Sequence, residues 1–452
     1  MTGRAPEDCG GLRGVLLELA RVAVEASRLE GRTRGALSGT QLGGPVFLVA
    51  LGKGAPAMAR GALEAIPRVE GGLVATVRGV DTGGLDGLEV VYGEHPVPGP
   101  GSLRAGEALL EWARLAGRSR GTLVALVSGG GSAIAEVPVE GVELGDIAEA
   151  TRLLLASGAS IDEVNTVRKH LSRIKGGRLA EAAAPARVLG LYASDVPGDR
   201  LDMIASGPTV PDPTTYADAL RVLRRYGLYD RMPVRVVEAL ERGARGELPE
   251  TPKPGSPVFG NVENRLVASN MDVLEAMRGW LEGRGYRVLV LTSRLEGESR
   301  EVARVLAAIA LESAGRGVPL EPPAAILAGG ETTVTVRGPG RGGRNQELAL
   351  AWAERMSYWG ATCEAGLVAL DTDGIDGVTD AAGAAVLPLD AARARGEGLD
   401  PLEALDRNDS YTLLDRLGAL VRTGPTGSNL NSVVAVIVAS RLRGTAGVGA
   451  WP

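Results

Sequence analysis

Short apolar runs of strand length alternate with amphipathic stretches along most of the chain. The runs Val46–Leu51 and Thr122–Val127 are continuous enough for buried strands, and a helix-period pattern follows the first of them at Ala55–Ile66. The second half repeats this alternation, with a predicted helix at Asn270–Leu281 and a predicted strand at Gly366–Leu370. Strands separated by helices predict an α/β fold, built as two α/β domains with largely parallel, Rossmann-like sheets.

A proline-rich segment separates the two halves of this pattern. Leu248–Pro257 contains four prolines in ten residues and shows no hydrophobic periodicity, which is typical of a linker. We therefore predict an N-terminal domain over residues 1–247 and a C-terminal domain over residues 258–452. A chain of 452 residues is long enough for two domains, each with its own core.

Glycine-rich turns follow two of the predicted strands in the first half. Gly52-Lys53-Gly54 comes directly after Val46–Leu51, and Ser128-Gly129-Gly130-Gly131-Ser132 comes after Thr122–Val127. Ligands bind at the carboxyl ends of strands in open α/β sheets, and backbone N–H groups in such loops suit an oxyanion or a phosphate. Tight turns without a ligand are the alternative. Only four of the 49 basic residues are lysine, which favours a specific role for Lys53.

The stretch Gly329–Glu347 carries the densest set of polar groups. It places Glu331 after a Gly-Gly turn and then interleaves further glycines with Arg337, Arg341 and Arg344. We expect the glycines to let backbone N–H groups converge, and the guanidinium groups to make the loop attract anions. The stretch therefore predicts a phosphate site.

Acidic loops follow two other predicted strands. Asp195 lies in the sequence SDVPGD and Asp371 in DTDGIDG, and carboxylates of this kind suit a hard cation such as Mg²⁺. Asp-Gly pairs are also common in simple turns, which is the alternative. Asn429 precedes a further apolar run and is suited either to hold substrate or to cap a turn. His95 and His170 are the only histidines, each either catalytic or merely hydrogen-bonded.

Composition and charge exclude several classes of partner. A net charge of −6 and the lack of a long Lys/Arg run argue against general nucleic-acid binding. The longest apolar runs, such as Val433–Ala439, are too short to span a bilayer. Cys9 and Cys363 lie far apart and form no metal or redox motif, and two separate histidines make a zinc site unfavourable. We expect a cytoplasmic protein with no nucleic-acid or membrane partner.

Glycine- and arginine-rich loops, a rare lysine and Mg²⁺-type aspartates together indicate phosphoryl transfer. This chemistry depends on positioning and charge neutralisation more than on a covalent group. The chain has no P-loop of the form Gly-x-x-x-x-Gly-Lys-[Ser/Thr], and the loop at Ser128–Ser132 is not a Gly-x-Ser-x-Gly nucleophile elbow.

Motifs in one consistent order resemble the glycerate 2-kinase family, whose C-terminal half is the MOFRL domain. The resemblance covers about residues 12–440 and rests on LGKGA, LVSGGGSA, NTVRKHLSRIKGGRLA, SDVPGD…ASGPTVPDPTTY, GGETTVTV…GRGGRNQEL, LDTDGIDG and TGPTGSNLN. It implies ATP-dependent phosphorylation of the C2 hydroxyl of D-glycerate, giving 2-phosphoglycerate and ADP. ATP and Mg²⁺ are the implied cofactors.

Carried over residue by residue, the resemblance implies an active-site cleft between the two domains. Lys53 would stabilise charge and Arg344 would be its partner from the other domain. Asp195 would hold Mg²⁺ or accept the hydroxyl proton, and Asp371 would be the second candidate metal ligand. The other implied binding residues are Ser128, Gly129, Gly130, Gly131, Ser132, Glu331 and Asn429.

Two alternatives remain open at the level of the sequence. Some family members carry the label hydroxypyruvate reductase, so an NAD(P)H-dependent reductase is the first alternative. A non-catalytic protein that binds a phosphorylated metabolite is the second. The reductase needs a dinucleotide fingerprint with a ribose-binding acid about 20 residues further on. GKGAPA at Gly52–Ala57 has alanine in place of the third glycine, a residue sometimes accepted there, and Gly71-Gly72 stands where the acid is expected. We expect a monomer or a homodimer.

Overall fold

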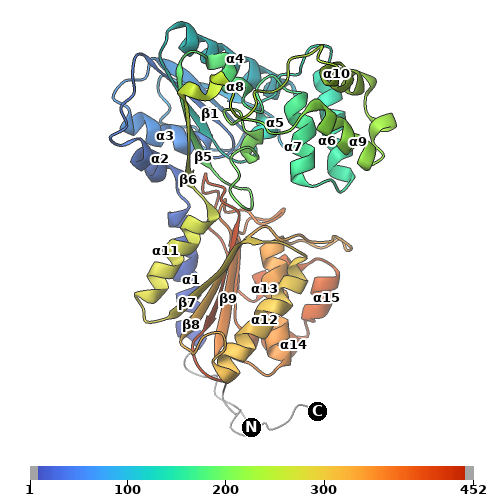
Figure 1. The fold of residues 1–452 in the computed structure, drawn as a ribbon. Coiled ribbons are helices and arrows are strands. Elements are labelled where there is room, and N and C mark those ends of the chain that lie inside the picture. The colour runs from blue at the N-terminus through green and yellow to red at the C-terminus, as the bar shows by residue number, and fades with distance from the viewer. Residues whose placement is uncertain (1–8, 443–452) are drawn as a thin grey trace, which may run out of the picture. The chain divides into compact units, whose positions relative to one another are not determined.

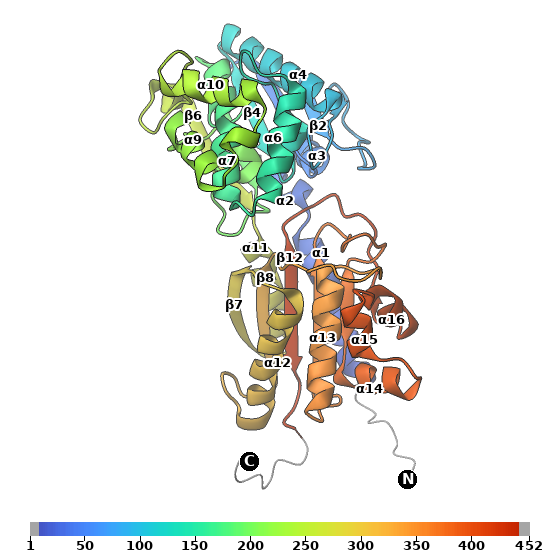
Figure 2. The same cartoon turned by 90° about the vertical axis from the view of Figure 1, so that its right-hand side faces the viewer.

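The chain divides into two compact units in the computed structural model, which describes residues 9–442 (Figure 1). The N-terminal unit comprises Arg28–Ser269 and the loop residues Gly427–Asn429. The C-terminal unit comprises residues 9–27, Asn270–Thr426 and residues 430–442. Each unit is a sheet packed against helices, as the turned view in Figure 2 also shows, so the predicted α/β class is confirmed.

The N-terminal unit contains a six-stranded parallel sheet with the order β3-β2-β1-β4-β5-β6. Its central strands are buried along their whole length, as strands of a helix-covered parallel sheet should be. The strands are β1 (Val46–Leu51), β2 (Gly71–Thr76), β3 (Glu89–Tyr92), β4 (Thr122–Val127), β5 (Arg187–Ala193) and β6 (Val262–Ala268). The helices are α2 (Leu29–Leu37), α3 (Ala55–Ala65), α4 (Pro100–Arg118), α5 (Gly131–Ile134), α6 (Leu144–Ala156), α7 (Ile161–His170), α8 (Arg178–Ala183), α9 (Tyr216–Arg225) and α10 (Val234–Ala244), with 3-10 turns η1 (Ile204–Ser206), η2 (Tyr229–Arg231) and η3 (Pro257–Asn261).

The segment predicted as a linker is instead a packed part of the N-terminal unit. Leu248 lies in a buried cluster with residues of α9 and α10, and the Thr251 hydroxyl donates to Asp212 at 3.0 Å. Beyond this segment β6 adds the last strand to the first sheet, so the chain divides after Ser269 and not at Leu248–Pro257. Proline content reports backbone stiffness, and stiff segments occur inside domains as well as between them.

The C-terminal unit contains a mixed six-stranded sheet with the order β11-β10-β9-β12-β8-β7. Among its pairs only β7 and β8 run parallel, which corrects the expectation of a largely parallel second sheet. The strands are β7 (Arg287–Leu295), β8 (Ala324–Gly330), β9 (Ala365–Asp371), β10 (Gly383–Val386), β11 (Leu420–Val421) and β12 (Ser432–Val438). The helices are α1 (Cys9–Ala26), α11 (Asn270–Glu282), α12 (Ser299–Arg316), α13 (Arg344–Tyr358), α14 (Pro388–Gly396), α15 (Pro401–Asp406) and α16 (Ser410–Arg416).

Connection lengths and one inserted strand explain this mixed sheet. β9 and β10 are joined by a short loop without a helix, which permits an antiparallel pair but not a parallel crossover. β8 and β9 are joined through α13 and point the same way, but β12 lies between them and runs antiparallel to both. The carboxyl ends of β8 and β9 therefore share one sheet edge with the amino end of β12, where Ser432 pairs with Gly330 and Asp371.

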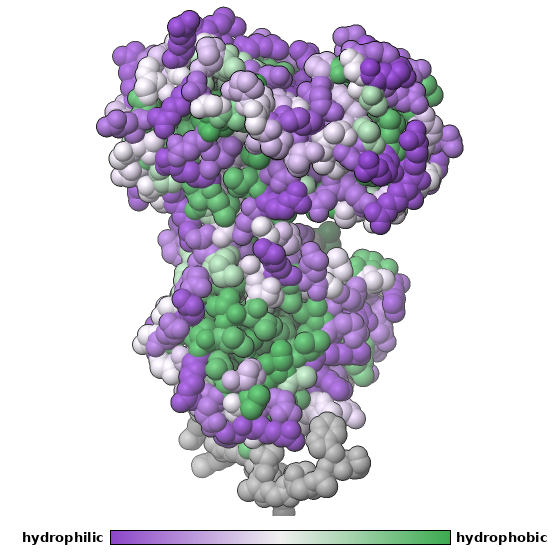
Figure 3. Space-filling view, in the orientation of Figure 1, coloured by the Kyte–Doolittle hydropathy of each residue, from purple (hydrophilic) through white to green (hydrophobic). Residues whose placement is uncertain are grey.

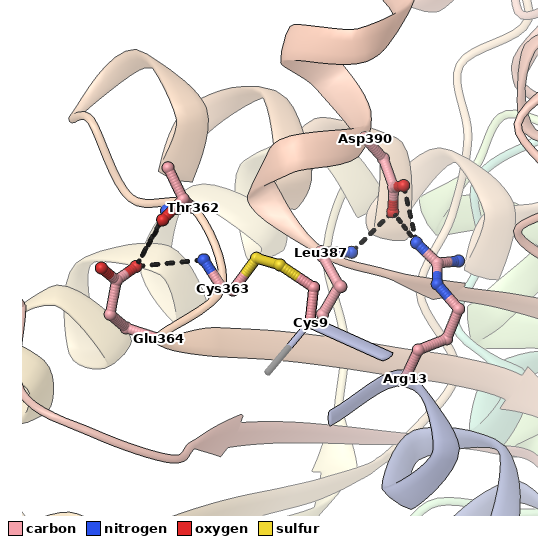
Figure 4. The surroundings of a disulfide bond; sticks show 7 residues. All are labelled: Cys9, Arg13, Thr362, Cys363, Glu364, Leu387 and Asp390. Carbon is pink, nitrogen blue, oxygen red and sulfur yellow. Dashed lines mark hydrogen bonds and ion pairs between the residues drawn. A yellow bond between two sulfur atoms is a disulfide. The ribbon is translucent and has the colours of Figure 1, made fainter. Parts of the chain in front are cut away.

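The first helix belongs to the C-terminal unit and not to the N-terminal domain that the sequence predicted. Its apolar face, which includes Leu16, is buried, and a Cβ at Gly366 of β9 would come within 2.8 Å of the Leu16 side chain. Figure 4 shows two further ties: a disulfide joins Cys9 to Cys363, and Arg13 pairs with Asp390 at 2.6 Å. The two cysteines, 354 positions apart in sequence, thus close a loop through the whole fold.

β7 forms one edge of the second sheet, and its side chains are half-buried or exposed. Leu291 of β7 is 43% exposed and Val305 of α12 is 59% exposed. Figure 3 shows hydrophobic residues gathered on the face of this unit where β7 and α12 are drawn. Among residues 9–442, no helix combines the length and the apolar content that a membrane crossing needs.

The disulfide should contribute substantially to the stability of the C-terminal unit. A cross-link lowers the entropy of the unfolded chain, more so for long loops, so Cys9→Ser should reduce the free energy of unfolding by about 2–5 kcal/mol. Denaturant unfolding followed by circular dichroism, with and without reductant, measures this difference. Reductant should lower the stability of the wild type to that of the variant and leave Cys9→Ser unchanged. A wild type insensitive to reductant would contradict the prediction.

Candidate active site

Three loops of the N-terminal unit meet at one edge of the parallel sheet. The turn with Lys53 follows β1, Ser128–Ser132 follows β4 and Asp195 follows β5, and these three strands are neighbours. Parallel strands end at the same edge, so the structure brings these predicted residues together as the sequence led us to expect. Glu94 and His95 follow β3 on the same side of the sheet.

Hydrogen bonds lock the Lys53 turn onto the serine–glycine loop. The Lys53 N–H donates to the Gly129 carbonyl at 2.9 Å, and the Gly54 N–H donates to Ser128 Oγ at 3.0 Å. Ser128 Oγ in turn lies 3.3 Å from the Leu51 carbonyl, which accepts its proton. The buried Ser128 hydroxyl is therefore used inside the protein, where it positions the turn. A Cβ at Gly52, whose φ is +122°, would lie 2.3 Å from this hydroxyl, so the contact requires glycine.

The backbone N–H groups of the same loop, unlike the Ser128 hydroxyl, are not used inside the protein over residues 9–442. Within the described part of the chain, Gly129, Gly130, Gly131 and Ser132 donate their N–H groups to no acceptor. Buried or half-buried N–H groups are nearly always paired, because leaving one without an acceptor costs free energy. Four in succession beside a lysine are therefore suited to an anion.

Charged side chains approach this loop because its residues lack a Cβ. A Cβ at Gly129 would lie 1.9 Å from Oδ2 of Asp195. A Cβ at Gly130 would lie 3.2 Å from the His95 ring and 3.3 Å from Cγ of Lys53. The loop thus places a carboxylate, an imidazole and the stem of a lysine around one short piece of backbone.

The electrostatics of this cluster favour binding of a negative group. Among residues 9–442, the Lys53 ammonium has neither an ion pair nor a hydrogen bond within the protein. Burial, together with the positive charges of Lys53 and Arg168, lowers the pKa of His95 to about 4. His95 is therefore neutral at pH 7, and the positive charge of the cluster resides on Lys53 and Arg168.

The rarity of lysine did not separate functional from structural positions. Lys169 lies within 3.4 Å of both Asp202 and Asp212, and Lys175 pairs with Glu136, all in buried or nearly buried surroundings. These two lysines are therefore structural ion pairs.

His170 also has a structural environment. Its Nδ1 lies 2.7 Å from the Thr166 carbonyl, and its Nε2 lies 2.9 Å from Glu250 in the segment predicted as a linker. The histidine thus helps to pack that segment onto α7, which favours the hydrogen-bonded interpretation over the catalytic one.

A second cluster lies at the corresponding edge of the sheet in the C-terminal unit. Arg344 is the first residue of α13, and its guanidinium donates to Glu331, to Asp371 at 2.7 Å and to Ser432 Oγ at 3.1 Å. Ser432 also donates to Asp371 at 2.8 Å. The structure therefore brings Glu331, Arg344 and Asp371 together, and the antiparallel strand β12 adds Ser432, which no motif had indicated.

Burial and charge act against each other in this cluster. Burial raises the pKa of Asp371 to about 7, with Arg344 opposing the rise and Asp376 and Asp373 adding to it. Burial also disfavours the charge on Arg344, but Asp371 and Glu331 outweigh it and raise the arginine's pKa. Arg344 is thus a permanent cation held between two carboxyl groups of different burial.

The glycine-rich loop before Arg344 is not the backbone anion site that the sequence suggested. The N–H groups of Arg337 and Gly338 both donate to the Asn408 side chain, and that of Arg341 donates to Asp409 at 3.0 Å. The Gly340 N–H donates to the backbone at residue 407. The glycines allow this close packing, since a Cβ at Gly340 would overlap the same segment. Arg344 alone remains directed at the acidic cluster.

The predicted metal ligands belong to separate units. Asp195 lies in the N-terminal unit and Asp371 in the C-terminal unit. Within the described ranges, no group of three or more acidic, histidine or cysteine side chains is arranged to hold a metal. Mg²⁺ usually takes one or two carboxylates together with substrate phosphates and water, so a single aspartate still fits as one of its ligands. Asn429 lies half-buried in the loop before β12 and groups with the N-terminal unit.

Comparison with known families matches both units. Residues 16–241 match the model described as a domain of unknown function (DUF4147), and residues 324–432 match the MOFRL family. The chain is 43% identical over 402 residues to the glycerate 2-kinase of Pyrococcus horikoshii, covering 89% of each protein. It is 45% identical over 405 residues to a protein of Agrobacterium vitis that is named a hydroxypyruvate reductase, covering 87% of each.

A solved structure has the same fold over nearly the whole length. The glycerate kinase of Thermotoga maritima superposes with a TM-score of 0.86 at 40% identity, covering 95% of this chain and 100% of that one. The similarity thus extends over both sheets.

The pH dependence of stability should reveal the protonation state of Asp371. Its pKa of about 7 in the folded protein lies above that of an unfolded aspartate, so the native state binds more protons between these values. The stability of the wild type relative to Asp371→Asn should therefore fall as the pH rises from about 4 to about 7, and level off above. Unfolding free energies of both proteins across this range test the sign. A relative stability that rises with pH would mean that the ion pair with Arg344 outweighs burial.

Proposed function

The chain belongs to the glycerate 2-kinase family, and on this premise we propose that it transfers the γ-phosphoryl group of ATP to the C2 hydroxyl of D-glycerate, giving 2-phosphoglycerate and ADP. The observation that carries this proposal is the loop Gly129–Ser132, whose four N–H groups have no acceptor within residues 9–442 and which lies against Lys53. Phosphoryl transfer needs fixed donors and positive charge where negative charge develops. This loop offers both.

Lys53 and Arg344 are the cations that we assign to charge neutralisation. Lys53 is a compact charge whose backbone is fixed by the hydrogen bond to Gly129 and which needs to break no ion pair to reach a ligand. Arg344 keeps its charge in all conditions relevant to catalysis, because Asp371 and Glu331 raise its pKa. Glu331 and Asn429 stay candidate binding residues.

Asp195 is the residue that we assign to the hydroxyl proton. Its carboxylate lies against Gly129, within the same cluster as Lys53. His95 is close by and is neutral at pH 7, because its pKa is lowered to about 4. Mg²⁺, when bound, would supply further charge neutralisation at phosphate oxygens, with Asp195 or Asp371 as its carboxylate ligands.

The reductase alternative has less support from the fold. A dinucleotide site of the Rossmann type needs the pattern Gly-x-Gly-x-x-Gly/Ala after the first strand and an acidic residue at the end of the second. The turn after β1 has alanine at the third position of this pattern, but β2 ends at Thr76, which offers no carboxylate. The name of the Agrobacterium relative is therefore not matched by the residues of this chain.

Product analysis tests the proposed function directly. Purified protein with D-glycerate, ATP and Mg²⁺ should release ADP and give the phosphorus NMR signal of 2-phosphoglycerate. Omission of glycerate should abolish ADP release. A product phosphorylated at C3 would correct the position of transfer, and oxidation of NAD(P)H by hydroxypyruvate without ADP release would support the reductase instead.

Removal of the Lys53 charge should strongly reduce turnover. Lys53→Ala should lower kcat by about 10²–10³-fold, the range seen when one preorganised electrostatic donor is removed. The fold should persist, because the hydrogen bond that fixes the turn comes from the backbone of residue 53 and not from its side chain. Steady-state kinetics and circular dichroism measure the two effects.

Arg337→Ala is the matched control for this experiment. Arg337 is an exposed cation whose backbone N–H makes its hydrogen bond to Asn408, so loss of its side chain should leave turnover unchanged. Near-normal kcat in Lys53→Ala would remove Lys53 from the mechanism.

A further inference from the structure

Arg168 differs from the other cations of the polar segment Asn165–Ala180. Lys169 and Lys175 pair with buried carboxylates, and Arg178 donates to the Ser172 and Pro249 carbonyls at 2.9 and 2.8 Å. Arg173 is exposed to solvent. Arg168 is half-buried, and within the described part of the chain its guanidinium has neither an ion pair nor a hydrogen bond. Such an arrangement is costly, because a desolvated charge normally needs a partner.

A chain of hydrogen bonds shows which surface this part of α7 faces. Asn165 lies one helical turn before Arg168 and so on the same side of α7. The Asn165 side chain accepts from Ser206 Oγ at 2.9 Å, and Ser206 Oγ lies 2.7 Å from Ser132 Oγ. Ser132 ends the loop whose N–H groups have no acceptor. This side of α7 therefore faces the candidate active site.

The 3-10 turn η1, whose Ser206 links α7 to the loop Gly129–Ser132, has a strained backbone. Ala205 and Ser206 have φ of +48° and +58°, values that residues other than glycine rarely adopt. The Ala205 methyl packs against Gly131, where a Cβ would come within 2.7 Å of it. Strain of this kind persists only where the surrounding contacts impose it. The turn thus fixes α7 firmly onto the glycine loop.

Arg168 and Lys53 act on the same histidine. His95 lies against Gly130, and both cations disfavour its protonation. The charge of Glu136 acts on Arg168, but its carboxylate already pairs with Lys175 and accepts the Val137 N–H at 3.0 Å. Two cations without internal partners and a neutral imidazole thus surround a loop of free N–H donors. Even with the carboxylate of Asp195 against Gly129, this excess of cations and N–H donors favours an anionic ligand.

From this geometry we propose that Arg168 is a substrate-binding residue that holds the carboxylate of the hydroxy-acid substrate. The proposal rests on the proposed function, in which the substrate carries a carboxylate next to the hydroxyl that is phosphorylated. A guanidinium presents a planar fork that matches a carboxylate with two parallel hydrogen bonds, whereas an ammonium is a point charge suited to a moving phosphoryl group. Arg168 therefore binds the carboxylate and Lys53 meets the phosphoryl group.

Arg168→Met tests the assignment, because methionine keeps much of the side-chain length and removes the charge. The KM for D-glycerate should rise at least tenfold, whereas the KM for ATP should change less than threefold. Arg168→Lys should recover part of the loss. The preference of the enzyme for D-glycerate over glycerol, which has the same hydroxyl but no carboxylate, should shrink in Arg168→Met.

Arg173→Met is the matched control, since Arg173 lies in the same segment, is exposed and carries no ion pair among residues 9–442. It should leave both KM values unchanged. The unfolding midpoint of Arg168→Met should equal or exceed that of the wild type, because the variant loses an unpaired, half-buried charge. A lower midpoint with unchanged KM values would identify Arg168 as structural and overturn the proposal.

Two further outcomes separate this proposal from the proposed function. A selective rise in the KM for ATP would mean that Arg168 binds a phosphate and would overturn the carboxylate assignment. If the wild type fails to phosphorylate D-glycerate, the proposed function fails, and calorimetric titration with D-glycerate alone still tests the site. Binding to the wild type that Arg168→Met weakens at least tenfold would support the assignment, and equal binding or no binding to either would overturn it.

Discussion

Close approach of backbone to backbone at the end of β1 and β4 is the constraint on which the candidate site depends. The turn at Gly52–Gly54 and the loop at Ser128–Ser132 are joined by hydrogen bonds and leave no room for a Cβ at Gly52 or Gly129. This contact sets the direction of Lys53 and the position of Asp195. Within residues 9–442, the loop's own N–H groups have no acceptor.

Ion pairs in the N-terminal unit distinguish the structural cations from those of the candidate site. The buried lysines of α7 and the segment after it have carboxylate partners, which offset the cost of removing an ammonium from water. Lys53 and the half-buried Arg168 have no ion pair within residues 9–442, and both act on His95 beside the glycine loop. A cation without an ion pair is tolerated at such a position where a bound ligand supplies the missing negative charge. The distribution of pairs therefore supports the candidate site independently of any motif.

The sequence predicted local features well and tertiary pairing poorly. Continuous apolar runs identified β1 and β4, because burial on both faces of a sheet leaves no polar alternation. The polar loops at strand ends followed from the general geometry of parallel sheets. The position of β12 between β8 and β9 could not be predicted, because strand pairing depends on partners far away in the chain. The same reason explains why α1 was assigned to the wrong unit and why Cys9 and Cys363 were not expected to meet.

The candidate site residues also divide into those that the sequence indicated and those that only the structure indicated. Lys53, Asp195 and Arg344 stand out in the sequence because rare residue types occur in glycine-rich surroundings. Ser432 and Arg168 do not, since their significance lies in what surrounds them. The glycines before Arg344 suggested a phosphate loop, but their N–H groups serve the segment around Asn408. A high glycine content shows that another group contacts the backbone of that segment closely. Only the fold shows whether this group is a ligand or another part of the protein.

The two assigned cations differ in how they can meet a phosphate. Lys53 has no internal partner within residues 9–442, so an anion gains its full attraction. Arg344 already lies between Glu331 and Asp371, and any phosphate must compete with them. Glu331 is about half exposed, so it can exchange its ion pair with Arg344 for contact with water at little cost. Asp371 is buried and keeps its ion pair with Arg344. Arg344 therefore can turn one side to a ligand while Asp371 holds the other, and its acidic neighbours keep it in place when no ligand is bound.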